Sequence, residues 1–328
     1  MADTCPHFDY LLVIPRLQVQ NANALSSPLT HGFPAMSAFV GLMWALERKV
    51  HDAGLDLQFN ATAVVAHRHE EQITKGGFVH SLRLTRNPIN RDGSTAAIVE
   101  EGRIHLDISL VFGVRSATLR ADGSSAEAEK IAHQVRDILS QMRIAGGSVI
   151  PSTAPPRKQR PYIVSMIDED ERAGLFDQIK LRLLPGFVLV DRTDLLEQRH
   201  QALQALNPEA SKLDAWLSLS RINWTYTSGE AEQKAQWEND RKGLGWIVPI
   251  PVGYGALGEL QAPGSVAHVR DERTHFRFVE SLYSIGEWIS PHRLHSAEQL
   301  LWYADSAPEE WRYRCRNDYP LTPTDDFS

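Results

Sequence analysis

Residues 103–110 have the most regular alternation of apolar and polar side chains in this 328-residue chain. Every second residue is a large aliphatic one: Ile104, Leu106, Ile108 and Leu110. The residues between them are polar: Arg103, His105, Asp107 and Ser109. Because successive side chains of a strand point to opposite faces, the segment predicts a strand with one buried face and one polar face. At least part of the fold is therefore expected to be a half-buried sheet.

The first part of the chain adds further strands and a helix. The apolar run from Tyr10 to Leu17 predicts a buried strand, in which Pro15 indicates an edge or a bulge. A polar loop is expected at 18–34, and apolar residues at helical spacing then predict a helix that begins at Ser37. Residues 62–68 predict a second strand.

A second helix is expected after the alternating strand. Ser124 begins a capping-box pattern, and aliphatic residues follow it at helical spacing. The pair Gly146-Gly147 is predicted to end this helix. One more strand is expected either at 148–150 or at 186–190. The resulting order predicts a ferredoxin-like core, an arrangement that RNA-recognition folds also use.

The second half of the chain has a different character. Residues 151–161 (PSTAPPRKQRP) are rich in proline and charge and predict a connector. Helical spacing predicts helices at 194–206, 212–219 and 275–289. The Gly/Pro-rich stretch 243–264 is expected to be irregular. We predict an α+β protein with a core at 1–192 and a mixed, helix-containing accessory region at 193–328.

Composition favours a soluble globular protein. Hydrophobic residues make up 42% of the chain and charged residues 23%, enough for one large core or two smaller ones. The formal net charge of −7 argues against an extended basic surface, so any nucleic-acid site must be a local basic patch. The two cysteines, Cys5 and Cys315, form no disulfide or metal pattern. With no signal-peptide pattern and no long apolar run, we expect a cytoplasmic protein with no membrane contact.

Short polar side chains gather directly after the first predicted strand. Asn21, Asn23, Ser26 and Ser27 can donate and accept hydrogen bonds, which suits base edges and sugar-phosphate oxygens. The alternative interpretation is that they form turns and cap the next helix, and the sequence alone favours it.

Two arginines lie on a predicted turn within residues 84–103. Asn87-Pro88 is a strong turn signal, and Arg86 and Arg91 are close to it. A guanidinium that does not pack in a core is free to bind phosphate. The alternative is a solvated hairpin in which Arg91 pairs with a neighbouring carboxylate.

A third candidate segment is 143–150, RIAGGSVI. Arg143 could bind a phosphate there, and Gly146 and Gly147 could let an RNA backbone approach closely. Glycine also ends helices, and this alternative is favoured.

Catalytic and metal-binding patterns are scarce. His67 and His69 lie in a predicted strand, where this spacing puts both imidazoles on one face. No third ligand follows at a suitable spacing, so a histidine-rich edge strand is the favoured interpretation. The sequence contains no nucleophile elbow, phosphate-binding glycine loop or zinc signature. We expect no catalytic residue, no metal and no cofactor.

Six long strings of residues resemble the Csy2 family of type I-F CRISPR-associated proteins, a Cas-five-like group. They are LLVIPRLQVQNANALSSPLTHGFP (11–34), LTRNPINRDGSTAAIVEEGRIHL (84–106), LLPGFVLV (183–190), WIVPIPVGY (246–254), FVESLYSIGEWISPHR (278–293) and YRCRNDYP (313–320). They occur in the family's order and cover both ends and the middle of the chain, so the resemblance is specific.

The resemblance implies a ferredoxin-like core with an inserted arm, here at about 68–104. It implies a non-catalytic subunit of a Csy surveillance complex that binds the 5′ handle of the CRISPR RNA (crRNA) together with the large Csy subunit. An adjacent backbone Csy subunit is a further partner, and target double-stranded DNA is bound through the assembled complex. The residues expected to contact RNA are Asn21, Asn23, Ser26, Ser27, Arg86, Asn87, Arg91, Arg143, Gly146 and Gly147.

Two alternatives stay open at this point. The first is an endoribonuclease of the same superfamily that processes guide RNA, with His67, His69 or His105 as general base. The second is a scaffold that contacts only proteins, which the net charge of −7 favours.

Overall fold

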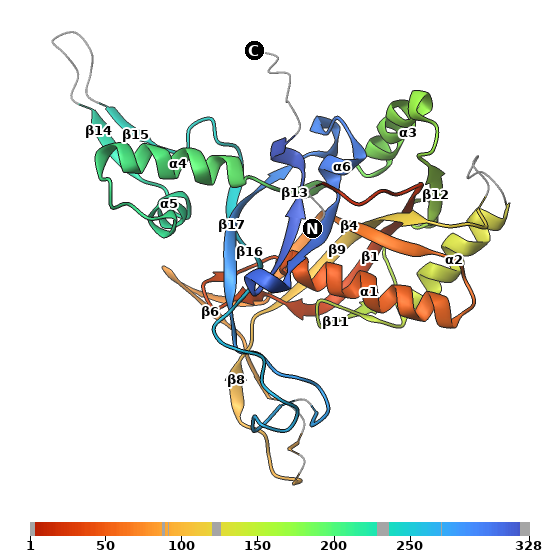
Figure 1. Cartoon of the computed structure of the whole chain (residues 1–328), viewed down its shortest axis with the longest axis horizontal. Helices are drawn as coiled ribbons and strands as arrows, with labels where there is room; N and C mark the ends of the chain where they lie inside the picture. Colours follow the sequence, from red (N-terminus) through yellow and green to blue (C-terminus); the bar gives the residue numbers. More distant parts are fainter. Residues whose placement is uncertain are drawn as a thin grey trace.

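The structure is a computed structural model of the chain. It describes residues 4–86, 89–90, 92–119, 126–227, 236–269 and 271–321. These residues form an α+β fold in which six α-helices accompany one eleven-stranded antiparallel sheet. Figure 1 shows the sheet in the middle of the molecule, with an arm below it and a helical lobe at the upper left. None of the helices in the described ranges is both long and apolar enough to cross a membrane.

The N-terminal half of the sheet contains its longest strands. They are β1 Tyr10–Asn23, β4 Gln58–Glu71 and β9 Arg103–Arg115, with β10 Arg143–Ile144, β11 Gly147–Ile150 and β12 Tyr162–Ser165 at the edge. Their order is β11–β1–β9–β4, and β12 also pairs with β1. The alternation predicted for residues 103–110 is confirmed, because Ile104, Leu106, Ile108 and Leu110 are all buried in one core cluster.

Helices cover both faces of this half of the sheet. α1 (Met36–Asp52) and α2 (Ala126–Ser140) bury their apolar stripes on one face. α3 (Glu169–Arg182) and α6 (Ala297–Leu300) pack on the opposite face in a second core cluster. β1 is therefore buried on both sides, which explains why the run 10–17 is apolar without alternation.

The sheet continues past β4 into five more strands. In spatial order they are β13 Phe187–Asp191, β17 Val279–Ile289, β16 Ile247–Ala256, β19 Arg312–Asn317 and β18 Trp302–Ala307. β18 returns to β4 through a bridge between Trp302 and Thr62, so six strands close into a ring. The two segments predicted as alternatives for the last strand of the core, 148–150 and 186–190, both contain strand residues. The first lies in β11, beside β1, and the second covers most of β13, beside β4.

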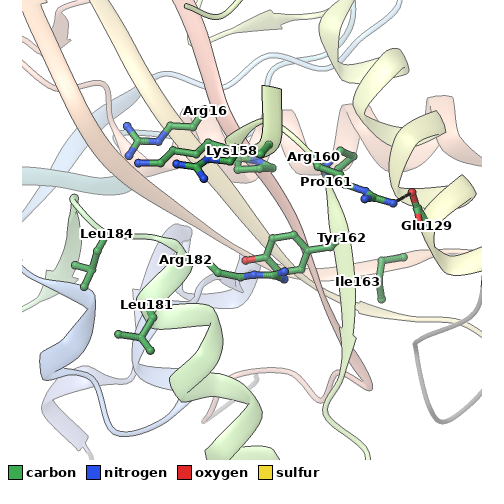
Figure 2. A pocket seen from close by; sticks show the side chains of 12 residues that line it. Arg16, Glu129, Lys158, Arg160, Pro161, Tyr162, Ile163, Leu181, Arg182 and Leu184 are labelled. Carbon is green, nitrogen blue, oxygen red and sulfur yellow. Dashed lines mark hydrogen bonds and ion pairs between the residues drawn. The ribbon is translucent and has the colours of Figure 1, made fainter. Parts of the chain in front are cut away.

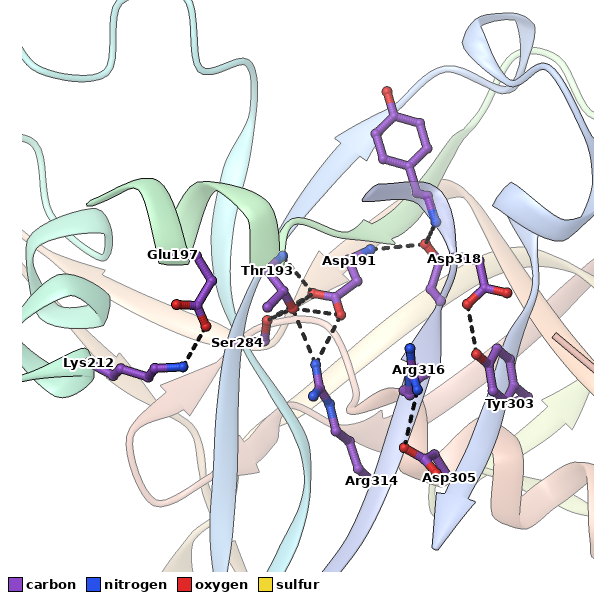
Figure 3. A network of polar contacts seen from close by, with 12 residues as sticks. Asp191, Thr193, Glu197, Lys212, Ser284, Tyr303, Asp305, Arg314, Arg316 and Asp318 are labelled. Carbon is purple, nitrogen blue, oxygen red and sulfur yellow. Dashed lines mark hydrogen bonds and ion pairs between the residues drawn. The ribbon is translucent and has the colours of Figure 1, made fainter. Parts of the chain in front are cut away.

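A buried carboxylate joins three strands of this ring (Figure 3). Asp191 of β13 accepts hydrogen bonds of 2.8 Å from the hydroxyls of Thr193 and Ser284, and Ser284 belongs to β17. The guanidinium of Arg314, on β19, lies 3.5 Å from the other carboxylate oxygen. Burial raises the pKa of Asp191, and the charge of Arg314 opposes this effect. The network thus ties the C-terminal strands to β13.

Two parts project from the sheet. The arm consists of the hairpins β5 Ile73–Gly76 with β6 Val79–Leu82, and β7 Leu84–Arg86 with β8 Ile98–Glu100. The lobe consists of α4 Thr193–Leu206, α5 Lys212–Leu219, β14 Trp224–Thr227 and β15 Gln236–Asn239. The helices predicted at 194–206 and 212–219 are thereby confirmed. The domain boundary predicted near residue 192 stays a prediction.

The structure corrects two predictions near β1 and α2. Residues 18–23 continue β1 instead of forming a loop, because bulges after Ile14 and Val19 keep its pairing with β9. The glycine pair does not end α2, whose last residue is Ser140. Ala145 and Gly146 instead form the turn between β10 and β11, with φ of 47° and 82°. Such a turn requires positive φ, which accounts for the glycine.

Two predictions in the C-terminal half are wrong. Residues 275–289 contain β17 and no helix, and 243–264 contain β16. The apolar residues of β17 do not alternate, because they contribute to clusters on both sides of the sheet. Pro249 and Pro251 are tolerated in β16 because this part of the strand pairs only with β17, and β19 joins it from Gly253 onward.

Candidate nucleic-acid interface

Two segments far apart in the sequence meet at one end of the sheet. The N–H of Asn23, at the end of β1, donates a 2.8 Å hydrogen bond to the carbonyl of Ala145 in the β10–β11 turn. A small hairpin of β2 (Leu25–Ser27) and β3 (Thr30–His31) then leads into α1. With α1, β16 and β19, these segments enclose a groove of about 610 Å³, which we call the aromatic groove. Its lining includes Asn23, Ser26, Gly41, Trp44, Arg143, Gly146, Tyr254 and Tyr313.

Three aromatic rings line the groove. Tyr254 and Tyr313 are stacked, with centroids 6.3 Å apart and planes inclined by 19°. Trp44 of α1 lies 6.3 Å from Tyr313. Trp44 and Tyr254 are 38% and 41% exposed, so both residues are accessible from the groove. Open aromatic faces bind unpaired bases by stacking, which contributes about 1–3 kcal/mol per base.

Arg143 supplies a positive charge at the edge of the groove. It is exposed on β10, and its guanidinium makes no ion pair with any described residue. The described lining residues include no carboxylate, so the charge of Arg143 stays available for a phosphate. The space beside the Cα of Gly146 is open, which would let a ligand backbone approach the turn.

The hydroxyls of Ser26 and Ser27 hold the β2–β3 hairpin together. They lie 2.8 and 2.7 Å from the Thr30 hydroxyl, and Ser27 also accepts from the N–H of Leu29. This is the turn-forming role that the sequence favoured. Neither caps α1, whose N-cap is Ala35 and has no side-chain cap. Ser26 lines the groove as well, whereas Ser27 is not among its lining residues.

Asn21, Asn23 and Gly147 have structural roles around the end of β1. Asn21 has a φ of 57°, and its N–H donates to Nδ1 of His105. The Asn23 amide closes a local turn with the backbone of Leu25. A Cβ on Gly147 would lie 2.7 Å from the β1 backbone, so close packing requires glycine there. Of these three residues, Asn23 lines the groove.

The second predicted segment belongs to the projecting arm (Figure 1). Arg86 lies in β7, where its backbone pairs with Ile98 of β8. Asn87 and Arg91 lie outside the described residues. RNA contact by the arm therefore stays a prediction.

His67 and His69 do not share a face, contrary to the prediction. A bulge beside His67 shifts the register of β4, so His67 faces Ser109 while His69 pairs with Leu106 on the opposite face. His67 is held at 2.6 Å by both the Ser109 hydroxyl and the Pro185 carbonyl, and burial lowers its pKa. In the described part of the chain, no three possible metal ligands cluster together.

Gly41, Trp44 and Tyr254 are groove residues that the sequence did not single out. One available signal was Trp44, a large aromatic residue off the apolar stripe of α1 and therefore on its solvent side. Nothing local connects Trp44 or Tyr254 with Arg143. The order of strands in the sheet brings them together.

The fold and the groove define an α+β protein whose large antiparallel sheet carries an open groove with aromatic, polar and cationic walls. The family model described as CRISPR-associated protein (Cas_Csy2) matches residues 12–315. The CRISPR-associated protein Csy2 of Pseudomonas aeruginosa (strain UCBPP-PA14) is 45% identical over 314 residues, covering 93% of this chain and 94% of that protein. The chain therefore belongs to the Csy2 family of CRISPR-associated proteins.

Proposed function

We propose that this chain is a structural subunit of a type I-F CRISPR RNA-guided surveillance (Csy) complex and that its aromatic groove binds the 5′ handle of the crRNA. Membership of the Csy2 family supports the complex. The observation that carries the RNA site is the meeting of Asn23, Arg143 and Tyr254 in one groove whose described lining has no carboxylate. These residues come from three distant parts of the chain.

In this proposal each wall of the groove contacts a different part of a single-stranded RNA. Bases stack on the rings of Trp44 and Tyr254, and Arg143 neutralises a phosphate. Gly146 leaves room for the sugar-phosphate backbone. Single-stranded RNA is bound through splayed bases and backbone shape, so these contacts fix one end of the guide before the complex assembles.

We further propose that β1, α1, β4, β9, α2 and β11 form a ferredoxin-like core. The antiparallel order β11–β1–β9–β4 supports this, as does the packing of both helices in one cluster on one face. The same sheet continues into the C-terminal strands, which supply Tyr254 and Tyr313 to the groove.

The family membership also supports the remaining partners. They are the large Csy subunit as heterodimer partner, an adjacent backbone Csy subunit, and target double-stranded DNA bound through the assembled complex. A cytoplasmic location belongs to the same proposal, because the guide RNA and invading DNA meet there.

We propose no catalytic role for the chain. A guide-processing endoribonuclease needs a free general base. His67 is engaged at both ring nitrogens and its pKa is lowered by burial, and His105 accepts a hydrogen bond from the Asn21 N–H. This engagement supports a structural role for His67 and His105, but it does not extend to His69, the third candidate base, which is exposed on β4.

The test begins with expression of the chain together with the other Csy subunits and guide RNA. We expect it to elute with the large subunit and an RNA of defined 5′ end. Elution of the chain without RNA, from cells that contain the guide and the other subunits, would refute the role in the complex.

The groove is tested with the Arg143→Ala, Tyr254→Ala double variant. Loss of one stacked base and one phosphate contact should weaken binding of labelled handle RNA about 10- to 2000-fold. It should also lower the salt slope by about 0.7. The matched control is Arg221→Ala with Tyr226→Ala, which are exposed residues of the lobe. Equal affinities of the two double variants would refute the groove as the handle site.

A further inference from the structure

The proline-rich connector 151–161 covers a gap in the pairing of β1. β11 pairs with Gln18–Gln20 and β12 pairs with Tyr10–Val13, which leaves Pro15 and Arg16 between them at a bulge. The connector passes this gap and the C-terminal end of α3. Together they enclose a second cavity of about 520 Å³, separate from the aromatic groove (Figure 2).

This second cavity, the basic cavity, has a large surplus of positive charge. Its lining includes Arg16, Arg157, Lys158, Arg160 and Arg182, with Glu129 as the one carboxylate among the described lining residues. Arg160 pairs with Glu129, and Arg16 lies 3.5 Å from Asp107. Five cations against these two carboxylates leave a surplus of three. On a chain of net charge −7, such a concentration is local and distinct.

Two of these cations are free to bind a ligand. Arg157 and Lys158 are exposed at the short 3₁₀ turn Pro156–Lys158, and neither has an ion pair with a described residue. Lys158 lies alongside Arg16 in Figure 2, both directed into the same space. Two or three converging cations are the usual arrangement for binding phosphate.

The cavity suits an extended polyanion better than a single small anion. A neighbouring cavity of about 350 Å³ shares Pro15 and Arg16 with it. It adds Arg136, which pairs with Asp137 of the same lining, and the serines Ser140 and Ser152. The two cavities therefore adjoin each other at Pro15 and Arg16. Guanidinium groups and hydroxyls along the two cavities match the repeated phosphates and sugars of a nucleic-acid strand.

The lining favours the backbone over the bases. Its one aromatic residue among those described is Tyr162, whose ring is covered by the Arg182 guanidinium at 4.4 Å. Burial raises the pKa of Tyr162 to about 12, consistent with its enclosed position. Tyr162 is therefore less available for stacking than the exposed Trp44 and Tyr254 of the groove.

We propose that the basic cavity is a second nucleic-acid site, which binds the phosphodiester backbone of a strand irrespective of its sequence. The ligand chemistry is shared by guide RNA and by DNA. This inference extends the proposed function. The aromatic groove is expected to supply the preference for the handle, and the basic cavity is expected to supply affinity for any strand. The test can therefore distinguish failure of the basic cavity from failure of the aromatic groove.

The test uses the full-length chain and three labelled probes: a 20-nucleotide RNA unrelated to the handle, the DNA strand of the same sequence, and its duplex. The Arg157→Ser, Lys158→Ser double variant should bind the favoured probe at least fivefold more weakly than wild type. The salt slope should fall by about 1.4 for a single strand, about 0.7 for each lost phosphate contact. The probe with the largest loss identifies RNA or DNA as the source.

The matched control is Arg221→Ser with Lys242→Ser, an exposed arginine and lysine of the lobe side. The proposal is overturned if the cavity variant and this control bind the probes with equal affinity. It is also overturned if the wild type binds none of the probes. A probe with uncharged methylphosphonate linkages should bind wild type and cavity variant alike. A difference that persists with that probe would also overturn the proposal.

The handle RNA separates the failure of this proposal from failure of the groove. The cavity variant should keep the wild-type ratio of affinity between handle RNA and unrelated RNA. Arg143→Ala with Tyr254→Ala should reduce that ratio. A cavity variant that loses the ratio instead would assign the cavity to the handle site and overturn sequence-independent binding.

Discussion

Gly41 offers a test of the aromatic groove that leaves the core untouched. It is exposed on α1 and lines the groove, and a Cβ at this position would meet no atom within 4 Å. Gly41→Ala should therefore raise the free energy of unfolding by about 0.5–1 kcal/mol, because alanine costs less backbone entropy than glycine in a helix. Its affinity for handle RNA should equal that of wild type.

Gly41→Gln and Gly41→Glu form a pair of the same shape that differs by one charge. If an RNA phosphate lies about 7 Å from the new carboxylate, Coulomb's law gives a repulsion of about 0.6 kcal/mol at the dielectric of water and about 2.4 kcal/mol at an effective value of 20. The Glu variant should thus bind handle RNA about 3- to 50-fold more weakly than the Gln variant. Both are good helix formers, so stability should be similar.

The measurement is fluorescence anisotropy of labelled handle RNA at about 50 and 200 mM salt. The difference between the Glu and Gln variants should shrink at the higher salt, because screening shortens the range of the repulsion. Equal affinities at low salt, with both variants folded, would mean that no phosphate passes near Gly41. The groove would then not be the handle site.

Two further predictions concern stability. A Cβ on Gly253 would clash with the Tyr313 carbonyl, so Gly253→Ala should lower the free energy of unfolding in urea by about 3 kcal/mol or more. The control is Gly255→Ala, which should lower it much less because the nearest atom to its Cβ would lie 3.3 Å away. Burial lowers the pKa of His67 from 6.5, so the unfolded chain takes up a proton first as the pH falls. The free energy of unfolding should therefore fall below about pH 6.5, by up to about 1.4 kcal/mol per pH unit. His67→Gln, which also loses the Ser109 contact, should remove this part of the pH dependence. An unchanged pH dependence in that variant would contradict the role given to His67.

Local periodicity predicted the elements that have one buried face. The alternation in β9, the stripe of α1 and the helices α4 and α5 were readable because each of these elements shows polar residues to solvent on one side. Elements buried on two faces lose this signal. β17 was consequently mistaken for a helix and β16 for an irregular stretch, while α3, whose apolar and polar residues follow no clear stripe, was not predicted at all.

The candidate site was predictable only in part. Asn23 and Arg143 were singled out separately, and the structure places both in one groove. Ser27 and Gly147 were singled out as well, yet their hydroxyl and backbone serve the β2–β3 turn and the packing against β1. A polar side chain in a sequence shows the chemistry it can do, but its hydrogen-bond partners depend on neighbours that the sequence does not place.

The amino-acid sequence by itself determined the α+β class, the half-buried strand at 103–110, the connector at 151–161 and the membership of the Csy2 family. Tertiary structure alone decided that Trp44, Arg143 and Tyr254 share a groove and that Arg16 meets Arg157 in a basic cavity. The physical reason is that a residue's burial follows from its own polarity and spacing. Its neighbours follow from strand order and bulges, which only the packing of the whole sheet sets.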